Sequence, residues 1–224
     1  MRIDKAEINN KIEISVFFLV YVILFVNAII MQDSWIAVVS AFCGITYTIL
    51  AGKGFPVCYL IGVVGSAFYS YLAFKSSLWG NLILYAGYYI PMQIAGFFQW
   101  NKNLKQDKAE IVKTKLKVKE KIVLFSITSI VSVIVIMFLN HFGDKSPVID
   151  GITTVFSILG MYLTVKRCYE QWIVWFGVNA LSLAMWLKIA LAGEKVYSTV
   201  IMWAVYTLLA VYFFILWKQE VRSR

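Results

Sequence analysis

Eight long apolar stretches, separated mostly by short polar connectors, run along the chain. Each is close to the roughly 20 residues that an α-helix needs to cross the hydrocarbon core of a bilayer. Connectors as short as Gln32–Ser34 and Gly52–Gly54 require successive helices to be antiparallel. The pattern predicts an all-α integral membrane protein with eight transmembrane helices, over Ile12–Met31, Trp35–Ala51, Phe55–Phe74, Leu78–Trp100, Ile122–Asn140, Gly151–Val165, Trp172–Leu191 and Val196–Trp217.

The composition agrees with this pattern and excludes a soluble protein. Hydrophobic residues make up 61% of the 224 residues and charged residues 15%, whereas soluble domains have about 45–50% and about 25%. The eight spans leave no room for a sizeable domain outside the membrane. Three cysteines without a C-x-x-C spacing and a single histidine argue against a disulfide framework or a metal site, and no cofactor is expected.

The basic residues are distributed unevenly between the two sides of the predicted membrane. With the N-terminus in the cytoplasm, 17 of the 21 lysine and arginine residues lie in cytoplasmic segments and only three in outer segments. Because basic residues favour the cytoplasmic side, both termini are predicted to be cytoplasmic. The net charge of +9 does not indicate a nucleic-acid partner, since these residues flank spans that contact the lipid bilayer. The lysine-rich segment from residue 101 to 121 is expected to be a solvated loop that sets the topology, with a regulatory or partner-binding loop as the alternative.

The two halves of the chain resemble each other weakly. In a gapless register Phe55–Trp100 aligns with Trp172–Trp217, which places Tyr89 on Tyr206, Phe97 on Phe214 and Trp100 on Trp217; a one-residue change in offset places Gly44 on Gly160 and Thr48 on Thr164. Two parallel three-helix units joined by an inverting helix are a known transporter plan, with the site between the units. The expected divisions are residues 1–34 (cytoplasmic end and an extra span), 35–100 (first bundle), 101–150 (basic loop and linker helix), 151–217 (second bundle) and 218–224 (cytoplasmic tail).

Polar and aromatic residues collect on one face of two spans. On the seventh span one helical face carries Trp172, Trp175, Asn179, Ser182 and Trp186. A similar stripe on the fourth span carries Asn81, Tyr85, Tyr89, Gln93, Gly96 and Trp100, and Tyr206 on the eighth span is the counterpart of Tyr89. Two carboxamides among aromatic rings suit a flat polar ring, which the rings stack on or attract by cation–π interaction. These positions, without Asn81, Gly96 and Trp100, form the predicted substrate site.

Each of these residue types also has a purely structural explanation. Tryptophans near span ends, such as Trp100 and Trp217, are typical of the interfacial belt, as are Trp35 and Trp79. Asn or Gln inside a span also ties helices together, for about 0.6 kcal/mol. Pro91 is expected to disturb the fourth span beside Gln93.

Ionisable residues are nearly absent from the spans. Of the 12 acidic residues only Glu13 lies in a span, near its end. A proton relay or a carboxylate-lined sodium site would need such residues at mid-membrane, and a phosphate site would need arginines. The predicted cargo is therefore an aromatic, unphosphorylated, neutral or softly cationic molecule that moves without ion coupling.

At these residues the chain resembles a known family. The E-x-W-x-x-W-x-x-x-N run at Glu170, Trp172, Trp175 and Asn179 is similar to the second half of the PnuC family of bacterial nicotinamide riboside transporters, and the Q-x-x-G-x-x-x-W run ending at Trp100 is similar to its first half. The resemblance covers about residues 35–217, so the first span looks like an addition to seven. It implies a SWEET-like 3+1+3 fold, a homo-oligomer (a trimer), and a place in the bacterial inner membrane.

The implied activity is facilitated uptake of nicotinamide riboside, a uniport made unidirectional when a cytoplasmic nicotinamide riboside kinase phosphorylates the product. Thiamine and riboflavin transporters share this architecture, so uptake of thiamine or another vitamin remains an alternative. A membrane enzyme is disfavoured because no Ser/His/Asp set, metal-ligand cluster or phosphate loop is present. A scaffold or receptor subunit is disfavoured by the convergent polar stripes.

Overall fold

The computed structural model describes residues 5–75, 79–106, 109–141 and 147–223, and these residues form helices and connecting loops. The helices are α1 (Lys5–Met31), α2 (Trp35–Lys53), α3 (Cys58–Lys75), α4 (Trp79–Leu82), the π-helix η1 (Ile83–Tyr89), α5 (Ile90–Asn101), α6 (Val118–His141), α7 (Pro147–Val165), α8 (Gln171–Leu191) and α9 (Tyr197–Arg222). In the described part of the chain, seven of them are long and apolar enough to cross a membrane, namely α1, α2, α3, α6, α7, α8 and α9. The predicted all-α membrane fold is confirmed.

The fourth predicted span is built from α4, η1 and α5, which follow one another without a break. Proline at position 91 has no N–H and its ring crowds the carbonyl four residues earlier, so the regular α-helical ladder is interrupted there. The backbone responds with a π-helical segment, closed by a bond from the N–H of Ile90 to the carbonyl of Tyr85. The expected disturbance is thus present, and the segment that carries it also carries Tyr85 and Tyr89.

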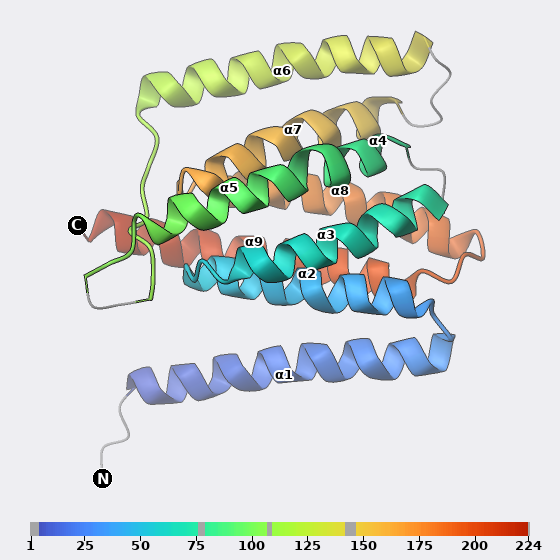
Figure 1. Cartoon of the computed structure of the whole chain (residues 1–224), viewed down its shortest axis with the longest axis horizontal. Helices are drawn as coiled ribbons and strands as arrows, with labels where there is room; N and C mark the ends of the chain where they lie inside the picture. Colours follow the sequence, from blue (N-terminus) through green and yellow to red (C-terminus); the bar gives the residue numbers. More distant parts are fainter. Residues whose placement is uncertain (1–4, 76–78, 107–108, 142–146, 224) are drawn as a thin grey trace.

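Two helices flank the bundle. Figure 1 shows α1 and α6 as its outermost helices, with the other helices between them. α6 packs against α7, and α1 packs against α2 and α9. Inside the bundle α2 contacts α3 and α9, while α7 contacts α8 and α5. If α2, α3 and the run α4–η1–α5 form one unit and α7, α8 and α9 form the other, the contact of α2 with α9 corresponds to the contact of α7 with α5. The repeat itself remains a prediction.

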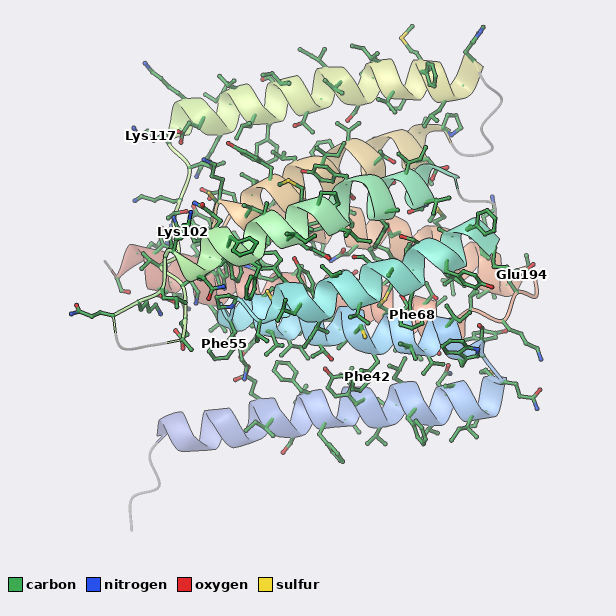
Figure 2. All side chains as sticks on the ribbon, viewed as in Figure 1. Phe42, Phe55, Phe68, Lys102, Lys117 and Glu194 are labelled. Carbon is green, nitrogen blue, oxygen red and sulfur yellow. The ribbon has the colours of Figure 1, made fainter. Side chains whose placement is uncertain are left out.

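The two ends of the bundle differ in charge. α1 begins and α9 ends at the same end (Figure 1). Lys102 and Lys117 lie at this end and Glu194 lies at the opposite end (Figure 2). We call the first the lysine-rich end. Both helix ends lie on one side, as an even number of crossings requires; the side of the membrane remains a prediction.

The segment between α5 and α6 packs against the lysine-rich end. Ile111 is completely buried, and its N–H donates a hydrogen bond to the carbonyl of Gly54 at 3.0 Å. Lys113 is also buried and forms an ion pair with Glu220. Partial burial lowers the pKa of Lys105, but hydrogen bonds to the carboxylates of Glu110 and Glu220 raise it by more, so the pKa of Lys105 is raised overall. The segment is therefore not the fully solvated loop that we expected.

The α1–α2 connector caps a distant helix. The carboxylate of Asp33 accepts hydrogen bonds from the N–H groups of Tyr197 (3.3 Å) and Ser198, the first two residues of α9. Replacing Asp33 with alanine leaves these N–H groups without a partner, and we expect the free energy of unfolding to fall by about 1 kcal/mol. The measurement is the midpoint of thermal unfolding in detergent.

Ser34→Ala is the matched control. Ser34 occupies the N-cap position of α2 but its side chain makes no capping hydrogen bond, so its loss should leave the midpoint unchanged. Equal midpoints for the two variants would contradict a capping role for Asp33.

Candidate substrate-binding site

A cavity lies among α2, α3, η1, α5, α7, α8 and α9. The cavity has a volume of about 90 Å³, and its concave aromatic lining with a few polar groups is the feature it shares with small-molecule sites. It brings together seven of the nine residues predicted for the site, namely Tyr85, Tyr89, Gln93, Trp172, Trp175, Asn179 and Tyr206. The other two, Ser182 and Trp186, are buried in α8 but do not line the cavity.

The two carboxamides differ in how they are held. The Nε2 of Gln93 donates a hydrogen bond to the hydroxyl of Ser66 at 3.0 Å, and this hydroxyl in turn lies 3.3 Å from Oε1 of Gln93. Gly62 allows the approach, since a Cβ there would lie 3.0 Å from Nε2. Asn179 is buried at 5% exposure and makes no hydrogen bond through its side chain with another described residue. Gln93 is therefore oriented in advance, and Asn179 is free to bind a ligand.

Aromatic rings form the walls of the cavity. The rings of Tyr69 and Tyr85 stack with centroids 4.2 Å apart, Tyr85 meets Tyr89 edge-on at 4.6 Å, and Tyr89 meets Trp175 edge-on at 6.3 Å. The continuous row crosses from α3 through η1 to α8. It offers ring faces and edges from both halves of the chain to one ligand.

Trp175 is held in place by its indole nitrogen. Its Nε1 donates a hydrogen bond to the hydroxyl of Thr164 at 3.0 Å, and this hydroxyl donates to the carbonyl of Gly160 at 2.8 Å. Gly160 faces the indole closely, because a Cβ there would lie 3.0 Å from the ring. The glycine and threonine that drew attention as repeat positions therefore support the wall of the site.

Several lining residues were missed by the sequence analysis. Ser66 and Tyr69 come from α3, Gln171 begins α8, and Trp203 lies on α9, while Tyr47 comes from α2. A single Tyr or Ser in an apolar helix is not distinctive, so periodicity did not select them. The sequence held one signal that α2 contributes to the site: the recurrence of Gly44 and Thr48, which marked α2 as the counterpart of α7.

Two tryptophans predicted for the interfacial belt are instead part of the core. Trp100 and Trp217 are completely buried. The Nε1 of Trp100 donates to the carbonyl of Thr164 at 3.0 Å, and the Nε1 of Trp217 donates to the carbonyl of Gly52 at 2.6 Å. The belt assignment was wrong for both, because their indole N–H groups find carbonyls at the ends of α7 and α2. Trp35, with 66% of its surface exposed, does fit the belt, and the side chain of Trp79 lies outside the described residues.

The lining of the cavity contains no Asp, Glu, His, Lys or Arg among the described residues. Its polar groups are hydroxyls, carboxamides and indole N–H groups. A bundle of membrane-crossing helices that encloses an uncharged aromatic cavity is the architecture of a carrier for small organic molecules.

The sequence comparisons agree with this class. Residues 34–219 match the family model described as nicotinamide mononucleotide transporter. The nicotinamide riboside transporter PnuC of Neisseria mucosa is 32% identical over 195 residues, which cover 85% of this chain and 74% of that protein. The PnuC of Haemophilus influenzae is 31% identical over 194 residues, covering 85% and 82% of the two chains. The chain belongs to the PnuC family, and it is a multi-pass membrane transporter and not an enzyme.

A solved structure supports the assignment. The crystal structure of the vitamin B3 transporter PnuC superimposes with a TM-score of 0.85 at 29% identity, covering 95% of this chain and 92% of that chain. The family match begins only at residue 34, after α1. However, the uncovered 5% of this chain is shorter than α1, so at least part of α1 has a counterpart in the solved structure.

Proposed function

We propose that this transporter carries nicotinamide riboside by facilitated diffusion. The observation that supports the proposal best is the uncharged aromatic cavity with one fixed carboxamide, Gln93, and one free carboxamide, Asn179. A pyridinium ring suits the faces of Tyr85 and Trp175 through cation–π attraction. The carboxamide of the ligand can exchange hydrogen bonds with a protein carboxamide, which has both donors and an acceptor.

The absence of charge in the described lining favours the riboside over the mononucleotide. The family model is described by the mononucleotide, whereas the relatives are named for the riboside. A phosphate group is ordinarily bound by arginine, lysine or a cluster of N–H groups. Since no cationic side chain lines the cavity, removal of a phosphate from water would be poorly compensated there.

The lack of ionisable side chains in the described lining also supports uniport. Coupling to protons or sodium ordinarily uses a carboxylate or histidine within the membrane, and none lines the cavity among the described residues. Net uptake would then be maintained by a cytoplasmic kinase that phosphorylates the product. Uptake into proteoliposomes without any ion gradient is the expected result, and a requirement for a proton or sodium gradient would contradict uniport.

The substrate is tested by calorimetric titration of the purified protein with nicotinamide riboside, its mononucleotide and thiamine. We expect saturable binding of the riboside and much weaker binding of the mononucleotide. Thiamine is the informative competitor, because it too is an aromatic cation of similar size. Tighter binding of thiamine than of the riboside would replace the proposed substrate by the alternative one.

We further propose that both termini face the cytoplasm in the bacterial inner membrane and that the protein forms a homo-oligomer, a trimer as the family resemblance suggests. The positive-inside rule supports the orientation, since the lysine-rich end (Figure 2) also holds the beginning of α1 and the end of α9 (Figure 1). Cysteine labelling at position 102 from either side of the membrane tests the orientation, and native mass spectrometry tests the oligomer.

Trp175→Ala should weaken binding of the riboside by about 1–3 kcal/mol, because stacking on one aromatic ring contributes that much in other sites. The variant also loses the indole that bonds to Thr164. The measurement is calorimetric titration of a variant whose thermal unfolding resembles that of the unmodified protein. Trp35→Ala serves as control, since this exposed tryptophan does not line the cavity; equal affinities for the two variants would exclude stacking on Trp175.

A further inference from the structure

The chain between α5 and α6 crosses the lysine-rich end of the bundle and joins the α2–α3 connector to the α7–α8 connector (Figure 1). We call residues 109–117 of this chain the strap. On one side the N–H of Ile111 donates a hydrogen bond to the carbonyl of Gly54, which follows α2, at 3.0 Å. On the other side the N–H of Thr114 donates to the carbonyl of Arg167, which follows α7, at 2.8 Å. The strap therefore bridges helices of the two predicted bundles.

The strap lies directly beyond the substrate cavity. Three residues of the cavity lining lie in the terminal turns of α2, α7 and α8 at the lysine-rich end, namely Ala51, Thr164 and Gln171. The strap forms hydrogen bonds just beyond each of them along the chain, at Gly54, Lys166 and Glu170. It thus ties together the three helix ends that a ligand passes when it leaves the cavity at this end.

A carrier must expose its site to the two sides of the membrane in turn. We propose that the strap is a latch, which holds the cavity closed at the lysine-rich end and releases from Gly54 each time the cavity opens there. The inference goes beyond the proposed function, because it concerns how the cavity opens and applies to whichever ligand is carried.

The strap is bound firmly to the α7–α8 connector. The N–H of Tyr169 donates to the carbonyl of Thr114 at 3.0 Å, and the hydroxyl of Thr114 donates to the carbonyl of Lys166 at 2.9 Å. Nη1 of Arg167 donates to the carbonyl of Val112 at 3.1 Å. Arg167 also has a φ of 62°, in the left-handed region that side chains other than glycine's rarely adopt. Such a conformation persists only where its surroundings enforce it, so the strap and this connector form one unit.

The strap also contacts the wall of the cavity through α9. Lys113 is buried and forms an ion pair with Glu220 near the end of α9. Its Nζ lies 5.1 Å from the centre of the ring of Trp217. Trp217 in turn meets Trp172, a residue of the cavity lining, edge-on at 5.7 Å. A movement of the cavity wall formed by α8 and α9 is therefore transmitted to the strap.

The contact with the α2–α3 connector is much weaker. Among the described residues the strap makes a single hydrogen bond there, from Ile111 to Gly54, and the side chain of Ile111 is completely buried. The chain just before the strap does not add to this contact, because Lys105 forms an ion pair with Glu220 of α9 at 2.9 Å. One hydrogen bond and one apolar side chain are lost more easily than several hydrogen bonds and a buried ion pair. The release is therefore assigned to Gly54.

A disulfide between positions 54 and 111 tests the latch. A Cβ at position 54 would lie 3.1 Å from Cγ1 of Ile111, and a cysteine sulfur takes about the place of that carbon. This is close to the separation of about 3 Å between a Cβ and the partner sulfur in a disulfide. In the variant Gly54→Cys with Ile111→Cys, copper phenanthroline takes two electrons and two protons from the thiols to form the bond, and dithiothreitol returns them.

Uptake of nicotinamide riboside into proteoliposomes by the oxidised double variant should fall about tenfold or more, because each transport cycle includes the opening that the bond prevents. Dithiothreitol should restore it to the level of the same variant before oxidation. Calorimetric titration of the oxidised variant should still show binding, since neither residue lines the cavity. The variant Gly54→Cys alone measures the effect of placing a side chain at a φ of 83°.

Thr114→Cys is the matched control. The hydroxyl of Thr114 lies 3.5 Å from the sulfur of the natural Cys168, so oxidation of this variant ties the strap to the connector from which it does not release. Uptake should then be unchanged. Normal uptake by the variant with the 54–111 disulfide, verified by mass, would refute the latch, and an equal loss in both oxidised variants would refute release from Gly54. If the unmodified protein carries thiamine and not the riboside, the proposed function fails, and the latch is tested by the same comparison with thiamine.

Hydrogen exchange tests the latch without any substitution or ligand. The N–H groups of Ile111 and Thr114 both donate to backbone carbonyls on opposite sides of the strap. After correction for intrinsic rates, the N–H of Ile111 should exchange about tenfold faster, because it becomes free each time the latch opens. Exchange of Thr114 as fast as that of Ile111, measured by mass spectrometry of fragmented peptides, would contradict the proposed direction of release.

Discussion

Asn179→Leu is expected to weaken the binding of nicotinamide riboside by about 10- to 100-fold. The side chain of Asn179 is buried, lines the same cavity as the aromatic rings, and has no hydrogen-bond partner among the described residues. Leucine has nearly the same shape but cannot pair with the carboxamide of the ligand, which would then be buried unsatisfied. Such a loss corresponds to about 1–3 kcal/mol, and each 1.4 kcal/mol is a factor of ten in affinity. The measurement is calorimetric titration.

Asn27→Leu is the control for this prediction. Asn27 also lies in a membrane-crossing helix and has a buried, unpartnered side-chain oxygen, but it belongs to α1 and does not line the cavity. Its replacement should leave the affinity unchanged. If Asn179→Leu folds normally and binds the riboside like the unmodified protein, Asn179 does not bind the ligand and its assignment to the substrate site is wrong.

Gly52→Ala is expected to destabilise the fold by about 1–3 kcal/mol, the usual cost of overpacking a core. A Cβ at this position would overlap the aromatic ring of Phe213 on α9. The ring is buried at 1% exposure, and the carbonyl of Gly52 accepts the hydrogen bond from Trp217, so α2 cannot move away without losing that bond. A lower midpoint of thermal unfolding in detergent is the measurement.

Gly177→Ala provides the matched control, because a Cβ at position 177 meets no atom within 4 Å. Both glycines lie inside helices, where alanine is intrinsically favoured by about 1 kcal/mol. The control should therefore be neutral or slightly stabilised, whereas Gly52→Ala should be destabilised. A midpoint for Gly52→Ala as high as that of Gly177→Ala would mean that the contact between α2 and α9 is looser than described.

The helices lie where the sequence predicted them, whereas the surroundings of single aromatic residues were predicted less well. Each predicted span corresponds to a helix or, for Leu78–Trp100, to the continuous run α4, η1 and α5. The helices extend past several spans, as α6 does by starting at Val118 and not at Ile122, because polar residues at the ends of a span remain helical outside the hydrocarbon. Trp100 and Trp217 have the composition and position of belt residues, yet they are buried. Nothing in their local sequence distinguishes an indole that faces headgroups from one that faces a backbone carbonyl.

The site was predicted as far as helical periodicity extends. Trp172, Trp175 and Asn179 share a face of α8 and do line the cavity, but Ser182 and Trp186 on the same stripe lie beyond it. A stripe shows which residues of one helix point together and does not show where along the helix the facing neighbours separate. The substrate roles of all these residues remain predictions.

The sequence by itself determined that the chain crosses a membrane as helices and where the crossings lie, and it predicted transport without a carboxylate at mid-membrane. Hydrocarbon imposes these features locally, since each span must satisfy its own backbone and exclude charge. Only the tertiary structure decided that Ser66 orients Gln93 and that Thr164 holds Trp175. The two hydrogen bonds join different helices, α3 with α5 and α7 with α8, and Gly62 and Gly160 leave the space for Gln93 and Trp175.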